Sequence, residues 1–193
     1  MRIRFVFQFF LLLTFLMLFS CATVPRFRFQ TDETIRAILK EPPAFPDAAF
    51  VVFSDPHYFD GSLGVQGAAF ESYLNEDRKL LRESEEILDQ AVRIIAETPA
   101  DFVIVSGDLT KDGELSSHLE VAQRLQLIEE AGRQVYVICG NHDILNPEAF
   151  RYEGDEKLRV ENVSPEDFTA IYSRFGYEEA IERDPASLSY IVE

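Results

Sequence analysis

Three short apolar runs, each followed by polar residues, constrain the fold of this chain most strongly. They cover residues 49–53, 102–106 and 135–139. Their length and their β-branched and aromatic content indicate buried strands, and patterns typical of helices lie between them. Strands that alternate with helices predict βαβ units and a largely parallel sheet. The sequence therefore predicts an α/β fold.

The polar residues at the three strand ends predict a metal site. They are Asp55-Pro56-His57, Gly107-Asp108-Leu109 and Gly140-Asn141-His142-Asp143. In a parallel sheet, polar sites gather beyond the carboxyl ends of the strands. Asp55 and His57 are two residues apart and can face one ion from the same side of an extended chain. The carboxylate of Asp108 can bridge two ions. A metal pair at this edge would point to hydrolysis of phosphate esters.

The segments between and after the strands predict helices. One is expected over residues 75–97 and another over residues 114–131, before Gly132. The apolar face of the first would hold Leu80, Ile87, Leu88, Ala91, Ile94 and Ile95. A third helix should begin after the N-cap Ser164 and stop at Gly176, and residues 187–192 are typical of a strand. The glycine-containing stretch 61–67 is expected to be a surface loop, with a substrate lid as the alternative.

The N-terminus resembles a bacterial lipoprotein signal. Arg2 and Arg4 precede an apolar segment over residues 5–19, and Cys21 follows. Residues 1–21 would then be the signal peptide with Cys21 lipidated, residues 22–46 a tether, and residues 47–193 the globular domain. An uncleaved membrane anchor is the alternative. Both interpretations place the domain at the cell envelope, attached to a membrane on the extracytoplasmic side.

Cysteine content and charge narrow the chemistry further. Cys139 is the only cysteine besides Cys21 and is expected to be a buried, inert thiol, although a disulfide between the two is the alternative. The formal net charge of −16 argues against general nucleic-acid binding, which needs clustered Lys and Arg. A phosphate substrate would need bound cations to reverse the local field.

The order of D-x-H, G-D and G-N-H-D resembles the calcineurin-like metallophosphoesterase superfamily. The resemblance covers about residues 49–143 and implies the N-terminal half of a four-layer α/β/β/α sandwich. It implies a phosphate monoester or diester substrate and two divalent ions, with Mn²⁺, Zn²⁺ or Fe²⁺ suited to the mixed oxygen and imidazole ligands. Purple acid phosphatases have a tyrosine where this chain has Lys111, so a ferric–tyrosinate site is not expected.

The resemblance also implies a role for each motif residue. Asp55 and His57 would bind the first metal ion, and Asp108 would bridge both ions. Asn141 would bind the second ion. His142 would act near the leaving group, as a proton donor or a transition-state stabiliser, and Asp143 would orient it.

One departure from the family leads to a second hypothesis. The family pattern continues with a further His and then Gly-His-x-His, whereas this chain contains only His57, His118 and His142. We therefore expect residues 47–193 to be a phosphoesterase domain incomplete at its C-terminus. Its sheet would expose an apolar face, on which a second chain could complete the sandwich. The alternatives are a non-catalytic remnant or binding module, and a structural lipoprotein. His118 falls inside a predicted helix and is expected to be structural or exposed.

Overall fold

The computed structural model describes residues 33–40 and 44–193 of the chain. The chain divides into two compact units, residues 1–47 and 48–193. In the first unit the described helix is α2 (Glu33–Lys40). Among the described residues, no helix has the length and apolar content needed to cross a membrane. The predicted signal segment and Cys21 lie outside the described residues.

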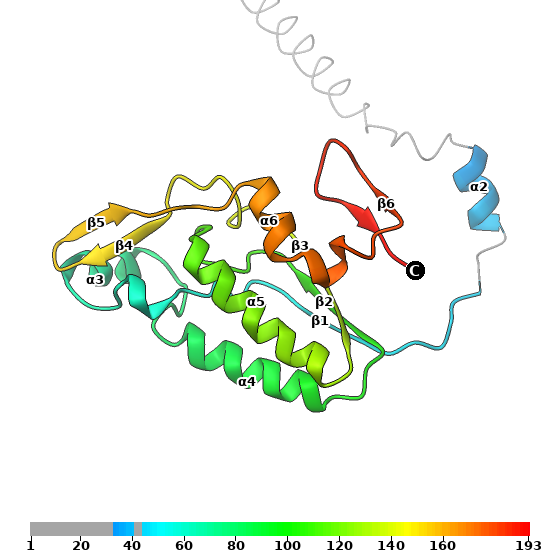
Figure 1. The fold of residues 1–193 in the computed structure, drawn as a ribbon, viewed down its shortest axis with the longest axis horizontal. Coiled ribbons are helices and arrows are strands. Elements are labelled where there is room, and N and C mark those ends of the chain that lie inside the picture. Colours follow the sequence, from blue (N-terminus) through cyan, green and yellow to red (C-terminus); the bar gives the residue numbers. More distant parts are fainter. Residues whose placement is uncertain (1–32, 41–43) are drawn as a thin grey trace, which may run out of the picture. The chain divides into compact units, whose positions relative to one another are not determined.

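A three-stranded parallel sheet is the centre of the second unit (Figure 1). Its strands β1 (Phe50–Phe53), β2 (Phe102–Ser106) and β3 (Gln134–Ile138) lie in that order. Phe50 pairs with Phe102, which pairs in turn with Gln134, so all three strands start level with one another. Their carboxyl ends therefore reach one edge together. The α/β fold with a parallel sheet that the sequence predicted is confirmed, with the third strand one residue earlier than expected.

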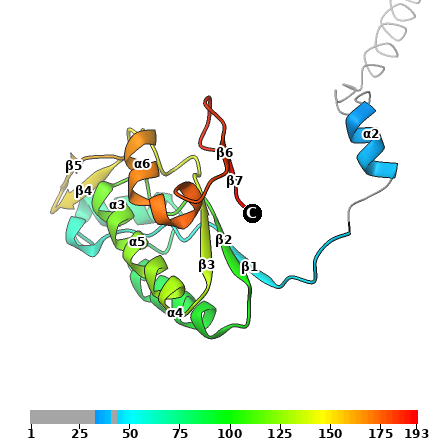
Figure 2. The same cartoon turned by 45° about the vertical axis from the view of Figure 1, so that its right-hand side comes forward.

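Two long helices cover one face of this sheet (Figure 2). They are α4 (Ser84–Glu97) and α5 (Leu115–Glu130). Because strand side chains alternate between the two faces, every second residue of β2 and β3 points toward these helices. The core between helices and sheet contains Leu88, Val92, Val103, Val105, Leu125, Ile128, Val135 and Val137. This core fixes the strands whose ends carry the three motifs.

The predicted helix over residues 75–97 is wrong in its first part. Helix α3 (Ala68–Glu76) precedes it, and the chain becomes extended at Asp77 before α4 starts at Ser84. The predicted apolar face is also half wrong, since Leu80, Ile87 and Ile94 are exposed. The buried face is offset around the helix and includes Ser84, whose hydroxyl accepts a hydrogen bond from the backbone N–H of Phe59. Because Ser84 is polar although it lies on the buried face, the apolar pattern alone indicated the wrong face of the helix.

A β-hairpin that the sequence did not predict lies beside α3 (Figure 1). It consists of β4 (Phe150–Glu153) and β5 (Glu156–Arg159). A small aromatic core joins the two elements and contains Phe59, Phe70, Leu81 and Tyr152. The stretch 61–67 begins with the short 3-10 helix η2 (Gly61–Leu63) and packs against this hairpin. A Cβ on Gly64 would lie 2.1 Å from the carbonyl oxygen of Tyr152, so this close packing requires glycine.

The C-terminal part continues with α6 (Pro165–Ile171), which Ser164 caps as predicted. A short π-type turn η3 (Ser173–Tyr177) follows, with Gly176 at φ 106°. The strands β6 (Glu182–Arg183) and β7 (Tyr190–Ile191) form a small antiparallel pair, shorter than the predicted strand over 187–192.

The face of the parallel sheet opposite α4 and α5 is apolar and open. Phe50, Val52 and Ile138 point from it and are each about half exposed, at 55%, 52% and 50%. A cavity of about 1260 Å³ lies between this face and residues 185–193. The expectation of an exposed apolar sheet face is therefore met among the described residues.

Candidate metal centre

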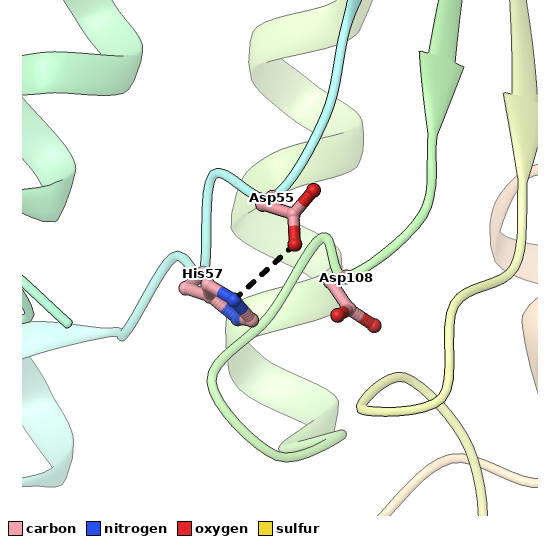
Figure 3. A group of neighbouring side chains, drawn as sticks. All are labelled: Asp55, His57 and Asp108. Atoms are coloured by element: carbon pink, nitrogen blue, oxygen red, sulfur yellow. Dashed lines mark ion pairs between the residues drawn. The ribbon is translucent and has the colours of Figure 1, made fainter. Parts of the chain in front are cut away.

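Backbone hydrogen bonds hold the first two motif loops side by side. The N–H of Asp55 donates to the carbonyl of Gly107, and the N–H of His57 donates to the carbonyl of Asp108, both at 3.1 Å. The loops leave adjacent parallel strands, so this pairing continues the sheet past β1 and β2. As a result, one ligand atom from each of Asp55, His57 and Asp108 lies within 4.8 Å of the other two (Figure 3). These three residues form the candidate metal centre.

All three residues of the centre have left-handed backbone conformations. The φ angles are 56° at Asp55, 41° at His57 and 51° at Asp108. Within the described ranges, Leu145 is the only other non-glycine residue with a positive φ. Such conformations cost a non-glycine residue on the order of 1–3 kcal/mol and persist where the surrounding structure imposes them. The fold therefore imposes unfavourable backbone conformations at the residues that converge.

Two glycines let the second and third motif loops touch. A Cβ on Gly107, whose φ is 81°, would lie 2.7 Å from the Cα of Gly140. A Cβ on Gly140 would lie 2.2 Å from the backbone nitrogen of Asp108. Side chains do not tolerate such contacts, so glycine is required at both positions. The contact lets the backbone N–H of His142 donate to Asp108 Oδ1 at 3.0 Å, which fixes that carboxylate.

The ring of His57 is oriented for metal binding through Nε2. Its Nδ1 lies 3.4 Å from the carbonyl oxygen of Thr110, while Nε2 lies 3.7 Å from Asp55 Oδ1. A backbone carbonyl at one ring nitrogen is the usual way to leave the other available as a ligand. Burial lowers the pKa of His57, and the positive charge of Lys79 lowers it further. Both effects favour the neutral imidazole that a metal ion requires.

His142 contacts a carboxylate that the sequence did not predict. Its Nδ1 lies 2.8 Å from Asp112 Oδ1, and its ring centroid lies 5.0 Å from that of His57. Asp112 is almost fully buried and also accepts a hydrogen bond from the side-chain amide of Asn146 at 3.2 Å. Asp112 and His142 are far apart in the sequence, so only the tertiary fold shows the pair. The G-D-L-T-K-D-G string was the available signal, since its second aspartate lies four residues after Asp108.

The carboxylate of Asp143 contacts backbone groups of the motif loops. Its Oδ2 accepts from the backbone N–H of Gly140 at 2.8 Å, and its Oδ1 accepts from that of Thr110 at 3.1 Å. The carboxylate turns back under the strand ends and is fully buried, and burial raises its pKa to about 6. Asp143 therefore joins the second and third motif loops, and its predicted role in orienting His142 stays a prediction.

Asn141 lies in the third motif loop, and no described hydrogen bond joins its side chain to Asp55, His57 or Asp108. Its neighbours Gly140 and His142 both make hydrogen bonds into the motif loops, whereas Asn141 itself is exposed. The predicted ligand role of Asn141 stays a prediction.

Lys111 points away from the candidate centre into a buried ionic cluster. Its Nζ lies 2.5 Å from Asp112 Oδ2 and 3.2 Å from Glu114 Oε1, and it donates to the carbonyl of Glu148 at 3.1 Å. The ammonium also lies 4.7 Å from the ring centroid of Tyr73. Lys111, at the position where purple acid phosphatases have a tyrosine, therefore holds Asp112 through its Oδ2 atom.

His118 is structural. Its side chain is fully buried on α5, Nε2 donates to the carbonyl of Asp143 at 2.8 Å, and Nδ1 accepts from the hydroxyl of Tyr172 at 2.9 Å. Burial lowers its pKa to about 4. Cys139 is a half-buried free thiol, and burial raises its pKa to about 12. Among the described contacts, neither side chain makes a hydrogen bond to Asp55, His57 or Asp108.

The donor atoms fit a divalent metal ion. Two carboxylates and one imidazole suit Mn²⁺, Zn²⁺ or Fe²⁺, and three protein ligands leave coordination positions open for substrate or water. A sequence model of the family described as calcineurin-like phosphoesterase matches residues 48–185 of the chain. That range holds all three motifs. A search of curated proteins found no match.

Proposed function

Because the chain belongs to the calcineurin-like phosphoesterase family, we propose that it hydrolyses phosphate monoesters or diesters with two divalent metal ions. The observation that carries the proposal is the convergence of Asp55, His57 and Asp108 in strained backbone conformations at one edge of the sheet. Strain that the fold maintains at a group of ligand-type residues is typical of a functional site.

The chain's own residues would divide the work between binding and proton transfer. Asp55 and His57 would hold one ion, Asp108 would contact both, and Asn141 would bind the second. The Nδ1 of His142 faces Asp112, so its Nε2 is the nitrogen left to protonate the oxygen of the departing group. Asp112 would keep the imidazole in that orientation.

Bound metal ions also resolve an electrostatic conflict. The chain carries a formal charge of −16, and acidic residues line the centre, so an unassisted phosphate ester would be repelled. When bound, divalent ions supply positive charge for the phosphate and lower the pKa of coordinated water. Mn²⁺, Zn²⁺ and Fe²⁺ are the ions we propose, because they accept both oxygen and imidazole ligands.

Turnover by matched variants tests the function. The purified protein, supplied with Mn²⁺ or Zn²⁺, should hydrolyse p-nitrophenyl phosphate or bis(p-nitrophenyl) phosphate. Asp108→Asn should reduce kcat/KM at least about 100-fold, because an amide replaces the central carboxylate. Asp155→Asn, in the exposed turn between β4 and β5, makes the same chemical change away from the site and should leave turnover unchanged. Full activity of Asp108→Asn would remove the proposed role.

The open apolar face of the sheet favours a second candidate function, a binding module without catalysis. On this hypothesis a second chain would cover Phe50, Val52 and Ile138, and the centre would hold at most one ion weakly. The metal content of the purified protein separates the two hypotheses. About two ions per chain together with turnover would reject the binding module.

We also propose that the domain is exported and held at a membrane by lipid on Cys21. The proposal rests on the basic and apolar segments that precede this cysteine. In a bacterial host, the wild-type chain should label with radioactive palmitate and fractionate with membranes. Cys21→Ala should lose the label. Labelling of the Cys21→Ala variant would contradict the proposal.

A further inference from the structure

Lys79 reaches the candidate active site from the loop between α3 and α4. Its side chain is only 11% exposed. Its Nζ donates to the carbonyl of Lys111 at 3.2 Å and lies 3.4 Å from His142 Nδ1 and 3.8 Å from Asp112 Oδ1. Burying an ammonium group is costly unless acceptors surround it. The carbonyl oxygen of Lys111 and the carboxylate of Asp112 therefore stabilise the positive charge of the Lys79 ammonium group.

The loop is shaped to direct this lysine inward. Asp77 ends α3, and its Oδ1 accepts hydrogen bonds from the backbone N–H groups of Arg78 at 2.6 Å and Lys79 at 3.2 Å. The hydroxyl of Tyr73 donates to the other oxygen of Asp77 at 2.9 Å. This turn points Lys79 toward the site and leaves Arg78 exposed. The break between α3 and α4 therefore places a lysine beside His142 and Asp112.

Two lysines flank the carboxylate that contacts His142. Asp112 Oδ2 is bound by Lys111, while Oδ1 accepts from His142 Nδ1 and from the amide of Asn146. Lys79 lies against the Oδ1 side, next to the imidazole. Its Nζ therefore lies within 4 Å of both the Asp112 carboxylate and the His142 imidazole.

We propose that Lys79 is a positioning residue for His142: together with Asp112 it holds the imidazole so that Nδ1 stays on the carboxylate and Nε2 stays available to the substrate. This rests on the proposed phosphoesterase function, in which His142 serves the leaving group. Loss of such a supporting contact lowers the chemical rate and leaves substrate binding largely intact, because it acts through the orientation of another group.

Three variants test the proposal. Lys79→Met removes the charge and keeps the length of the side chain, Lys79→Arg keeps the charge, and Arg78→Met removes an equal charge from the exposed neighbour. The ring nitrogens of the three histidines are followed by 15N–1H NMR in metal-free protein at a single pH. Kinetics with Mn²⁺ and p-nitrophenyl phosphate give kcat and KM separately.

Lys79→Met should change the His142 ring signals, because the ring loses a supporting contact beside Nδ1, and should lower kcat about 10-fold with KM unchanged. Lys79→Arg should restore most of kcat, and Arg78→Met should match the wild type. If Lys79→Met matches Arg78→Met in the NMR spectrum and in kcat, the positioning role is rejected. If the wild type shows no turnover with any metal, the proposed function fails, and the NMR comparison alone then decides the role of Lys79.

Discussion

At the scale of single residues, the fold places ordinary side chains in settings that change their chemistry. His57 is turned by a backbone carbonyl so that one nitrogen faces the candidate centre. His118, on a helix that contributes no ligand, is buried as a neutral donor to the carbonyl of Asp143. The same residue type therefore serves as a ligand candidate in one case and as internal support in the other.

The buried His118 should make stability depend on pH. Its pKa is about 4 in the folded chain against an ordinary 6.5, so the unfolded chain binds more protons between these values. The stabilising contribution is therefore complete above about pH 6.5 and is lost as pH falls toward 4, by on the order of 3 kcal/mol. Asp143, with its pKa raised to about 6, acts in the opposite direction.

Urea unfolding of the wild type and of His118→Gln at several pH values isolates this contribution. Each titration gives the free energy of unfolding at one pH. Because Asp143 is present in both proteins, the difference between their free energies of unfolding at each pH reports His118. The difference should narrow from pH 7 to pH 4. Curves that remain parallel over this interval would show that burial does not suppress the charge on His118.

At the scale of elements, the carboxyl ends of the strands determine where the ligands meet. The first two motif loops are paired by backbone hydrogen bonds, and the third approaches through Gly107 and Gly140. These contacts set the positions of the candidate ligands. Precise positions are needed because a metal ion tolerates little displacement of its ligands.

Gly140→Ala should therefore disturb the centre. Its new Cβ would lie 2.2 Å from both the backbone nitrogen and Oδ1 of Asp108. We expect a loss of about 1–3 kcal/mol in the free energy of unfolding, and weaker metal binding. Gly61→Ala is the control, because nothing lies within 4 Å of its added Cβ. Equal stability and metal affinity for the two variants would show that the loops can separate without cost.

The helix α5 offers a matched test of which face is buried. Leu125 is fully buried against the sheet, whereas Leu127, on the same helix, is 53% exposed. Leu125→Ala should lower the free energy of unfolding by about 2–5 kcal/mol, and Leu127→Ala should change it by about 0.5 kcal/mol or less. Thermal or urea unfolding measures both. A reversed order would contradict the packing of α5.

The sequence allowed the strands and the centre to be predicted because both depend on local patterns. Asp55, His57 and Asp108 follow apolar runs directly, and parallel strands bring such ends together. The partner of His142 was not predictable in this way, because Asp112 meets it only through the tertiary fold. Helix α3 and the loop with Lys79 were missed because the apolar residues near 80–95 fit a single continuous helix equally well.

At the scale of the whole molecule, the centre lies at the edge of a sheet that is covered on one face and open on the other. The core under α4 and α5 packs against the covered face of the sheet. Acidic charge dominates the chain, at a formal −16, so cations bound at the centre would also relieve repulsion within the fold.

Metal binding should therefore stabilise the whole unit. An ion that binds only the folded chain adds about 2.7 kcal/mol at 100 times its dissociation constant. Adding Mn²⁺ to metal-free protein should raise Tm, and a chelator should reverse the change. Mg²⁺ is a useful comparison, because it binds imidazole ligands poorly and should raise Tm less. A Tm that is independent of metal would argue against a specific site.

The most direct test of the central claim is a calorimetric titration of Mn²⁺ into metal-free protein. The wild type should bind at least one ion per chain with measurable heat. The double variant Asp55→Ala, His57→Ala should lose this binding while keeping the circular dichroism spectrum of the wild type. Equal binding by the double variant and the wild type would show that the three converging side chains are not a metal centre.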